Sequence, residues 1–318
     1  MVVVAVAGGT GAVGRTLLDT IAKSSEHHAI VLSRTAGPSS TYHGFERVAL
    51  DYDNIDQVEG ILKQHHVDIV VSCLVLVDDE SAMAQISLIR AAAQSKTVTR
   101  FIPTEFYLDF HAPIPGSDLL ANYQLEAEEE LLRHPQLTFT LLRAGIFLDH
   151  LTMPYNPKKT YIAPFWAFVD IEYEKCVFPE DGSFPLILSH STDVAAYIER
   201  LCGLPANKWP RQSLVASNRL EVRDLDLLIQ KVTGKQFQIA HDRQEDIVEG
   251  QITQLPSNKG VMTDFLRKVE HQIMLSMLSK AHVLPGKDLA ELFPEVQPTK
   301  IENFLEAGWD MKKTGPFG

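Results

Sequence analysis

The junction between the first apolar run and the glycines behind it constrains the fold more than any other stretch of the chain. Residues 2–7, VVVAVA, are apolar throughout and lead directly into GGTGAVG, after which a helical pattern begins. A continuous apolar run is typical of a strand in a parallel sheet that is covered on both faces. Gly8, Gly11 and Gly14 leave room for a tight turn and for a close approach of backbone N–H groups to a ligand. We therefore predict a turn that seats a diphosphate at the N-terminus of the helix.

The first half of the chain repeats this alternation of strand and helix. The apolar runs predict strands at residues 2–7, 29–33, 47–50, 68–74, 100–104 and 138–144. Helical spacing of apolar residues predicts helices at residues 12–23, 55–64, 81–94 and 119–133. Such alternation indicates an α/β fold with a doubly wound parallel sheet of the Rossmann type.

The pattern changes after about Asp149. Residues 153–169 are rich in proline and aromatic residues, and helices are expected at residues 191–202, 220–234 and 260–282. We predict a dinucleotide-binding Rossmann domain over residues 1–150 and a smaller, mostly helical substrate lobe over residues 151–318. Some later segments of this lobe are expected to return to the sheet.

Charge and composition exclude several classes of partner. The 318 residues carry a net charge of −12, so the basic excess of a nucleic-acid-binding protein is absent. No basic amphipathic stretch favours a membrane surface, and the longest apolar run, DIVVSCLVLV, is too short to span a bilayer. The first strand lacks the basic region and cleavage pattern of a signal peptide. We expect a cytoplasmic protein that binds neither nucleic acid nor membrane.

The cysteines predict neither a disulfide framework nor a metal site. Cys73, Cys176 and Cys202 lie far apart and form no CxxC pair. The twelve histidines include two adjacent pairs, but neither has the spacing of metal ligands with a third partner. No bound metal is therefore expected.

The end of the second predicted strand discriminates between the two nicotinamide cofactors. An acidic residue at this place would hydrogen-bond the ribose 2′-hydroxyl of NAD, but the chain has Ser33 and Arg34. Because a guanidinium can grip a 2′-phosphate, NADP(H) is the predicted cofactor, and a solvated arginine is the alternative. Asp51 follows the third strand and is placed to meet the adenine, although an aspartate in a turn is an equally good account.

Several stretches together resemble the NmrA-like and isoflavone-reductase-like group of atypical short-chain dehydrogenases. They run in the expected order over most of the chain and are GGTGAVG, RFIPTEF, TFTLLRAGIF, SHSTDVAAYIERLC and LEVRDLDLLIQKVTGKQF. The group contains reductases that act on conjugated or aromatic small molecules with NADPH. It also contains members that bind the dinucleotide and regulate other proteins with no known turnover.

The resemblance implies a role for particular residues of this chain. Arg34 would meet the 2′-phosphate, and Leu74 would lie near the ribose. The phosphates would be cradled by Gly8, Thr10, Gly11, Ala12, Val13 and Gly14. The residues expected beside the nicotinamide are Thr104, Glu105, Phe106, Ala144, Gly145 and Phe147.

The resemblance also places the catalytic position, and here the chain departs from the group. Its reductases usually carry a lysine on the helix before the sixth strand, which can hold the ribose hydroxyls and protonate a substrate oxygen. Counting back from Gly145 places Gln124 there, and its neighbours Asn122, Tyr123 and Leu125 are not lysines either. A glutamine can donate hydrogen bonds to ribose, but it cannot supply a proton.

Other residues are candidates for positioning or protonating the substrate. They are Thr104, Tyr123, which lies beside Gln124, and His150, which follows the sixth strand where ligands meet open α/β sheets. A purely structural histidine is the alternative for His150. Tyr155 and Lys159 have the Y-x-x-x-K spacing of short-chain dehydrogenases, but Pro157 between them argues against a helix, so we interpret the match as a coincidence.

Aromatic residues predict a pocket for a flat, hydrophobic substrate. The candidates for substrate contact are Phe106, Tyr107, Phe147, His150, Tyr155 and Trp166. The alternative is that the residues around Trp166, including Phe165 and Phe168, simply pack the lobe onto the sheet.

These observations favour an NADPH-dependent reductase of a small aromatic or conjugated carbonyl or imine compound in specialised metabolism. Because the lysine is missing, two alternatives stay open. One is a non-redox enzyme, a cyclase or isomerase, that keeps the NADP-bound scaffold. The other is an NADP(H)-sensing regulator without turnover, which alone of the three requires a protein partner.

Overall fold

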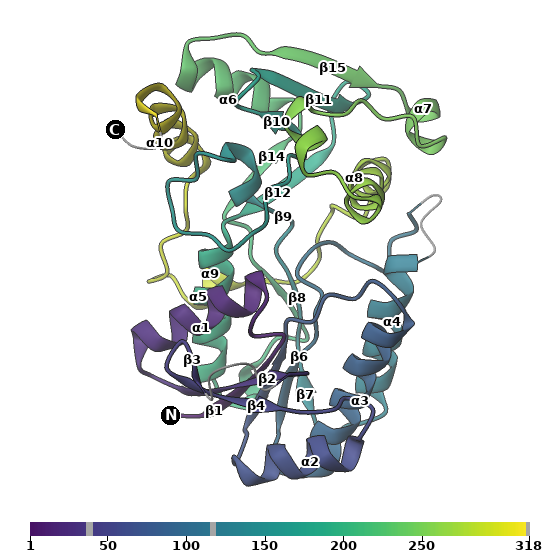
Figure 1. Ribbon diagram of the computed structural model, residues 1–318, viewed down its shortest axis with the longest axis vertical. Helices are drawn as coiled ribbons and strands as arrows, with labels where there is room; N and C mark the ends of the chain where they lie inside the picture. The colour runs from purple at the N-terminus through teal and green to yellow at the C-terminus, as the bar shows by residue number, and fades with distance from the viewer. Residues whose placement is uncertain (36–40, 115–118, 316–318) are drawn as a thin grey trace.

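The predicted strands assemble into a seven-stranded sheet in the computed structural model, which describes residues 1–35, 41–114 and 119–315 (Figure 1). The order of the strands is β3-β4-β2-β1-β5-β6-β7, and all neighbours are parallel except β3 and β4. Their bounds are β1 (Val3–Ala7), β2 (His28–Ser33), β3 (Thr41–Tyr42), β4 (Phe45–Ala49), β5 (Ile69–Ser72), β6 (Arg100–Ile102) and β7 (Thr138–Phe139). The chain runs outward from β1 in both directions, so the order reverses between β1 and β5, where Rossmann folds bind their ligands.

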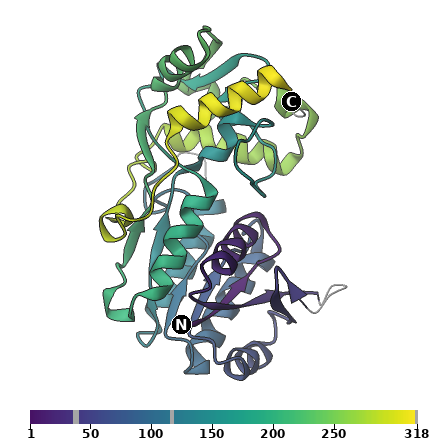
Figure 2. The ribbon, with the colours of Figure 1, turned by 90° about the vertical axis from the view of Figure 1, so that its left-hand side faces the viewer.

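Helices cover both faces of this sheet, which is why its strands are apolar throughout. One face carries α2 (Ile55–Gln64), α3 (Asp79–Ser95) and α4 (Leu119–Leu132), and the other carries α1 (Ala12–Ser24) and α5 (Ser191–Gly203). The two helices of the second face lie side by side (Figure 2). In β1, Val4 and Val6 pack toward α1 and α5, whereas Ala5 and Ala7 pack toward the other three helices.

Segments from the second half of the chain also join the Rossmann layer. The strand β8 (Leu141–Arg143), directly after β7, pairs in parallel with β13 (Gln212–Leu214), which in turn pairs with β16 (Lys287–Asp288). Helix α5 packs against α1, although it lies beyond the predicted boundary at residue 150. The assignment of the two domains to residues 1–150 and 151–318 stays a prediction.

The lobe above the sheet contains more strand than the sequence indicated (Figure 1). Two small sheets are formed by β9 (Ile146–Phe147), β12 (Pro185–Ser189) and β14 (Asn218–Glu221), and by β10 (Val169–Asp170), β11 (Lys175–Pro179) and β15 (Gln238–Asp242). The remaining helices are α6 (Asp224–Thr233), α7 (Gln244–Val248), α8 (Asp264–Met277), α9 (Leu289–Leu292) and α10 (Ile301–Thr314). The helix expected over residues 220–234 therefore begins later than predicted, because residues 218–221 pair with β12 instead.

Candidate dinucleotide site

The glycine turn after β1 has no room for side chains. Gly8 adopts a positive φ of 68°, and its carbonyl accepts a hydrogen bond from the Gly11 N–H at 2.9 Å. A Cβ atom on Gly14 would lie 2.5 Å from the Gly8 carbonyl oxygen, so the helix could not approach the strand as closely. Helix α1 begins directly after Gly11, and no side chain caps its N-terminus. The free N–H groups of its first turn are therefore available to an anion.

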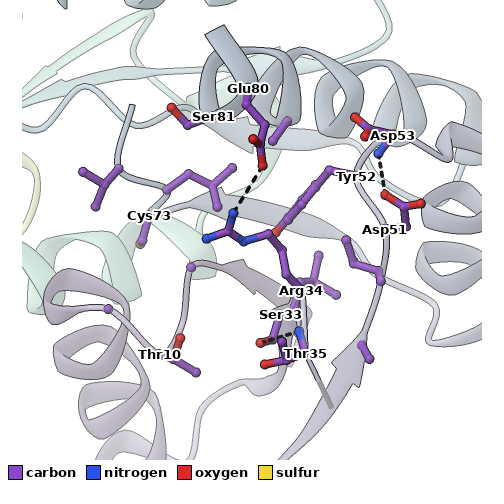
Figure 3. Close-up of a pocket in the computed structure, with 18 of the residues that line it drawn as sticks. Thr10, Ser33, Arg34, Thr35, Asp51, Tyr52, Asp53, Cys73, Glu80 and Ser81 are labelled. Atoms are coloured by element: carbon purple, nitrogen blue, oxygen red, sulfur yellow. Dashed lines mark hydrogen bonds and ion pairs between the residues drawn. The ribbon is translucent and has the colours of Figure 1, made fainter. Parts of the chain in front are cut away.

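A cavity of about 660 Å³ lies beside this turn (Figure 3). Its walls come from the glycine turn, the end of β2, the segment after β4 and the start of α3. The predicted residues that line it are Gly8, Thr10, Gly11, Ser33, Arg34, Asp51 and Leu74. Ala12, Val13 and Gly14 follow the turn on α1, where the side chain of Val13 packs toward the core. The cavity has the position expected for the adenosine half of a dinucleotide.

The charged groups of the cavity include one arginine that the sequence analysis missed. Arg34 extends across the cavity toward Glu80, with 3.6 Å between guanidinium nitrogen and carboxylate oxygen (Figure 3). Arg47, from β4, donates hydrogen bonds to Ser33 Oγ at 3.0 Å and to Thr35 Oγ1 at 3.2 Å. The parallel pairing of β4 with β2 places Arg47 opposite Val31 and so brings its guanidinium near Ser33, a register that the sequence did not indicate.

Two further groups of the cavity bear on a ligand. The carboxylate of Asp51 accepts a hydrogen bond from the Asp53 N–H at 3.0 Å, which is the geometry of a turn aspartate, and Asp51 also lines the cavity. The hydroxyl of Tyr52 is buried without a hydrogen-bond partner, and burial raises the pKa of Tyr52 above its usual range. The residues present fit a nicotinamide dinucleotide, because the turn excludes side chains and the buried Nε of Arg47 has no protein acceptor.

Thr104 connects the ends of β5 and β6, where the nicotinamide is expected. Its N–H donates to Gln85 Oε1 at 3.0 Å, and its hydroxyl donates to the Leu74 carbonyl at 2.9 Å. The Nε2 of Gln85 is buried without a partner. On the neighbouring helix α4, Gln124 Oε1 is also buried and unpartnered, so this amide can accept a hydrogen bond from a ligand.

Tyr123 already has a partner for its hydroxyl. It donates a hydrogen bond to Asp79 Oδ1 at 2.8 Å, and this bond raises the pKa of Tyr123. A tyrosine whose neutral form is stabilised in this way is a weaker acid at neutral pH. The arrangement therefore offers no support for Tyr123 as the proton donor.

A buried ion pair lies between the ends of β6 and β8. Arg143, fully buried at the end of β8, has a guanidinium nitrogen 2.7 Å from Glu105 Oε1 and 3.3 Å from Asp109 Oδ1. Burial raises the pKa of Glu105 to about 8, although Arg143 opposes the shift. Because one guanidinium faces two carboxylates, it cannot fully compensate both, and the more buried Glu105 retains its proton more readily.

The segment after β8 turns sharply at Gly145, whose φ is 68°. The Gly145 N–H donates to the Tyr107 carbonyl at 2.9 Å, and a Cβ atom here would collide with the Ile187 carbonyl. Ala144 is fully buried in the core beneath α1, so only its backbone can face a ligand. Phe106 and Phe147 are half-buried and pack against the same core.

His150 is held as a neutral acceptor. It lies in a short 3₁₀ helix, Leu148–Thr152, and its Nδ1 donates to the Phe165 carbonyl at 2.9 Å, which fixes the tautomer because a carbonyl can only accept. Burial lowers the pKa of His150, although the charge of Asp149 opposes this. At neutral pH its Nε2 can accept a hydrogen bond but has no proton to give.

The remaining aromatic candidates belong to the hydrophobic core of the lobe or pack against it. Trp166 is 6% exposed in the core of the lobe, and its indole N–H donates to the Met153 carbonyl at 2.9 Å, so packing accounts for it. Tyr155 donates its hydroxyl to Glu172 at 2.6 Å. Tyr107 is half-buried, with its hydroxyl 3.4 Å from Ser276 Oγ.

The loop that contains Tyr155 is tied to helix α1. Lys159 Nζ and the Tyr161 hydroxyl both lie 3.0 Å from Asp19 Oδ2. The guanidinium of Arg15 lies 5.5 Å from the centre of the Tyr161 ring and donates to the Thr10 carbonyl at 2.7 Å. Because Lys159 and Tyr155 have different partners, they do not form a catalytic pair.

Comparison with known proteins assigns this fold and site to a class. A family model for NAD(P)H-binding proteins matches residues 8–161. Oxidoreductase swnN of Metarhizium robertsii is 60% identical, with 99% of each chain covered. Oxidoreductase BOA1 of Botryotinia fuckeliana is 32% identical, with 94% of this chain and 97% of the relative covered. Among solved structures, a leucoanthocyanidin reductase–NADPH complex from Vitis vinifera is similar with a TM-score of 0.75 at 19% identity, over 97% of this chain and 99% of the other.

The fold and the site thus define an NAD(P)-dependent oxidoreductase with a Rossmann domain. The chain belongs to the NmrA-like, isoflavone reductase-like family. The predicted family, fold class and NADP(H)-type cofactor are confirmed at this level. In the described part of the chain, no helix is long and apolar enough to cross a membrane, and no group of three metal-ligating side chains is positioned to hold a metal ion.

Proposed function

We propose that this oxidoreductase uses NADPH to reduce a small aromatic or conjugated carbonyl or imine compound in specialised metabolism. The observation that carries the choice of cofactor is the end of β2, where Ser33, Arg34 and Thr35 include no carboxylate. Arg47 adds a second guanidinium at this place. Three buried free thiols are typical of a reducing compartment, so we place the enzyme in the cytoplasm.

The proposal gives the residues of the site the following roles. The bound cofactor supplies a hydride from its nicotinamide ring. The glycine turn and the first N–H groups of α1 bind the diphosphate, and the free Oε1 of Gln124 accepts a hydrogen bond from a ribose hydroxyl. Thr104 and Gly145 would hold the nicotinamide, and Phe106, Phe147 and the acceptor nitrogen of His150 would orient the substrate.

The lack of a good proton donor in the site favours an imine over a carbonyl compound as the substrate. A carbonyl oxygen needs a proton as the hydride arrives, whereas an imine that is already protonated accepts the hydride without further acid catalysis. Gln124 has no acidic proton, and the pKa shifts of Tyr123 and His150 make both poor donors near neutral pH. A protonated imine therefore requires no proton donor from this site.

The test measures NADPH oxidation at 340 nm with matched panels of cyclic imines and aromatic ketones. The wild-type protein should oxidise NADPH with the imines, and Gln124→Lys should raise the rate with the ketones. Asn122→Lys, an exposed position on the same helix, is the matched control for the added charge. Binding of NADPH without oxidation by either panel would contradict the reductase. Conversion of a substrate without NADPH consumption would instead favour the cyclase or isomerase.

A further inference from the structure

The cofactor cavity holds two arginines and one glutamate that together bear on the recognition of a phosphate. We propose that Arg47 is a second ligand of the cofactor 2′-phosphate, and that Glu80 is the counter-ion which this phosphate displaces from Arg34. The inference rests on the proposed use of NADPH, and it concerns how strongly the protein distinguishes NADPH from NADH.

Arg47 is placed for this role by the sheet. It lies on β4, whose parallel pairing with β2 brings it opposite Val31, two residues before Ser33. Its guanidinium reaches the hydroxyls of Ser33 and Thr35, the two residues that flank Arg34. When Arg34 exchanges Glu80 for a phosphate beside Ser33 and Thr35, that phosphate would also meet Arg47 and both hydroxyls.

One nitrogen of Arg47 has no hydrogen-bond acceptor within the protein. The Nε of Arg47 is buried and has no hydrogen-bond partner, whereas its Nη2 is engaged. Buried N–H donors are nearly always paired, so an unpaired donor beside a ligand cavity indicates an acceptor supplied by the ligand. Arginine forks bind phosphate oxygens with two parallel hydrogen bonds, which suits this donor.

Glu80 faces the same place with the opposite charge. It lies in the first turn of α3 and pairs with Arg34 at 3.6 Å across the cavity (Figure 3). Both side chains are largely exposed, at 78% for Arg34 and 81% for Glu80, so their attraction is weak and Arg34 can exchange this partner readily. A 2′-phosphate must displace Glu80 and then remain close to its charge, which weakens the binding of NADPH. A free 2′-hydroxyl can instead donate to this carboxylate, which favours NADH.

Arg47 and Glu80 therefore have opposite effects on the preference of the protein for NADPH over NADH. Arg47 raises the preference for the phosphorylated cofactor, and Glu80 lowers it. The other carboxylates that line the cavity, Asp51 and Asp53, come from the segment after β4 rather than from α3, and no ion pair joins either of them to Arg34. Asp53 provides a control that changes the charge of the cavity without touching the pair.

The experiment measures binding rather than turnover. Isothermal titration calorimetry with 2′,5′-ADP, 5′-ADP, NADPH and NADH is performed on the wild type and on Arg47→Gln, Arg47→Lys, Glu80→Gln and Asp53→Asn. Arg47→Gln should weaken 2′,5′-ADP roughly tenfold or more and leave 5′-ADP within about twofold, because only the former carries the phosphate. The affinity of Arg47→Lys for 2′,5′-ADP should lie between those of the wild type and Arg47→Gln, because lysine keeps the positive charge but cannot donate two parallel hydrogen bonds. Glu80→Gln should tighten 2′,5′-ADP about two- to fivefold, and more than Asp53→Asn does.

The outcomes separate this inference from the proposed function. If the wild type binds NADPH more tightly than NADH but Arg47→Gln keeps the full preference, Arg47 is not a phosphate ligand. If Glu80→Gln and Asp53→Asn have equal effects, the displacement of Glu80 is wrong. Failure of the wild type to bind NADPH would overturn the proposed function itself. Unchanged 5′-ADP affinity in the Arg47 variants shows that the cavity has kept its fold.

Discussion

The guanidinium of Arg143 lies 2.7 Å from the carboxylate of Glu105, and both side chains are buried where β6 and β8 end. Asp109 shares the same guanidinium at 3.3 Å and is itself 3.2 Å from the ring of His111. One arginine thus pairs with two acids, and in the chain Glu105 directly follows Thr104, which is proposed to flank the nicotinamide.

This sharing predicts a dependence of stability on pH. The pKa of Glu105 is about 8 in the folded protein, above its ordinary value of 4.5. Between these values the unfolded chain releases a proton that the folded chain keeps, so the contribution to stability is full below pH 4.5 and is lost as the pH rises toward 8. Glu105→Gln should remove this loss, which we expect to amount to about 1–3 kcal/mol.

Urea unfolding at pH 5, 6.5 and 8 tests this expectation. The unfolding free energy of the wild type should fall more steeply with pH than that of Glu105→Gln. Glu129→Gln, which changes an exposed glutamate on α4, serves as the control and should follow the wild type. Parallel curves for Glu105→Gln and the wild type would show that Glu105 is ionised in the folded protein.

Removing the guanidinium of Arg143 should lower the free energy of unfolding more than removing the carboxyl group of Glu105 or Asp109. Arg143→Met removes the counter-ion of Glu105 and Asp109, and we expect a loss of about 3–5 kcal/mol at pH 9, above the pKa of about 8 of Glu105, where both carboxyl groups are ionised in the wild type. Glu105→Gln in the same chain should restore part of this stability, because one of the two charges is then absent. A double variant no more stable than Arg143→Met would argue against charge as the cause.

The glycine turn predicts a sharp contrast between two glycines. Gly14→Ala places a methyl group against the Gly8 carbonyl, so the turn must open and NADPH binding should weaken roughly tenfold, about 1.4 kcal/mol. Gly60→Ala lies on exposed α2 with nothing within 4 Å of the added atom. This control should leave binding unchanged and stabilise the protein by about 0.5–1 kcal/mol. Calorimetric titration with NADPH and thermal unfolding measure both effects.

His150 should not control the pH profile near neutrality. Its imidazole is neutral there because burial lowers the pKa of His150, and it donates only through Nδ1 to Phe165. We expect His150→Gln to change KM for the substrate while the shape of the kcat/KM profile between pH 6.5 and 8 stays the same. Disappearance of a limb from that profile in the variant would identify His150 as an acid after all.

Asp19 should hold the loop of residues 155–161 closed. Burial opposes the ionisation of Asp19, but hydrogen bonds from Lys159 and Tyr161 outweigh it and lower its pKa. Asp19→Asn should leave the melting temperature nearly unchanged and accelerate tryptic cleavage after Lys159 severalfold. Asp56→Asn, an exposed change on α2, is the control, and equal cleavage rates in the two variants would contradict the proposal.

The strands and helices of the Rossmann half were predictable because each one shows its characteristic pattern within its own residues. Each strand is a short apolar run, each helix has its own periodicity, and the glycine turn carries its function in seven adjacent residues. Arg34 could be named for the same reason, since the residue after β2 follows directly from the strand that precedes it. The proposed roles of the individual site residues stay predictions.

Features that depend on distant pairing were not predictable. Arg47 reaches Ser33 only because β4 adopts one register on β2, and no local pattern shows which way its side chain turns. The lobe's short strands pair with partners far along the chain, as β11 does with β15, so none has a periodicity of its own to detect. For this reason the predicted helix over residues 220–234 includes residues 220 and 221, which belong to β14.

The contact of Arg15 with Tyr161 has a practical consequence for engineering. Exchanging residues 155–161 for the corresponding loop of a relative, with the aim of changing what the enzyme accepts, would remove the ring against which Arg15 lies. Because Arg15 also donates a hydrogen bond to the Thr10 carbonyl in the glycine turn, such a chimera would disturb the cofactor site as well as the substrate specificity. Loop and helix α1 should therefore be transplanted together, as one cassette.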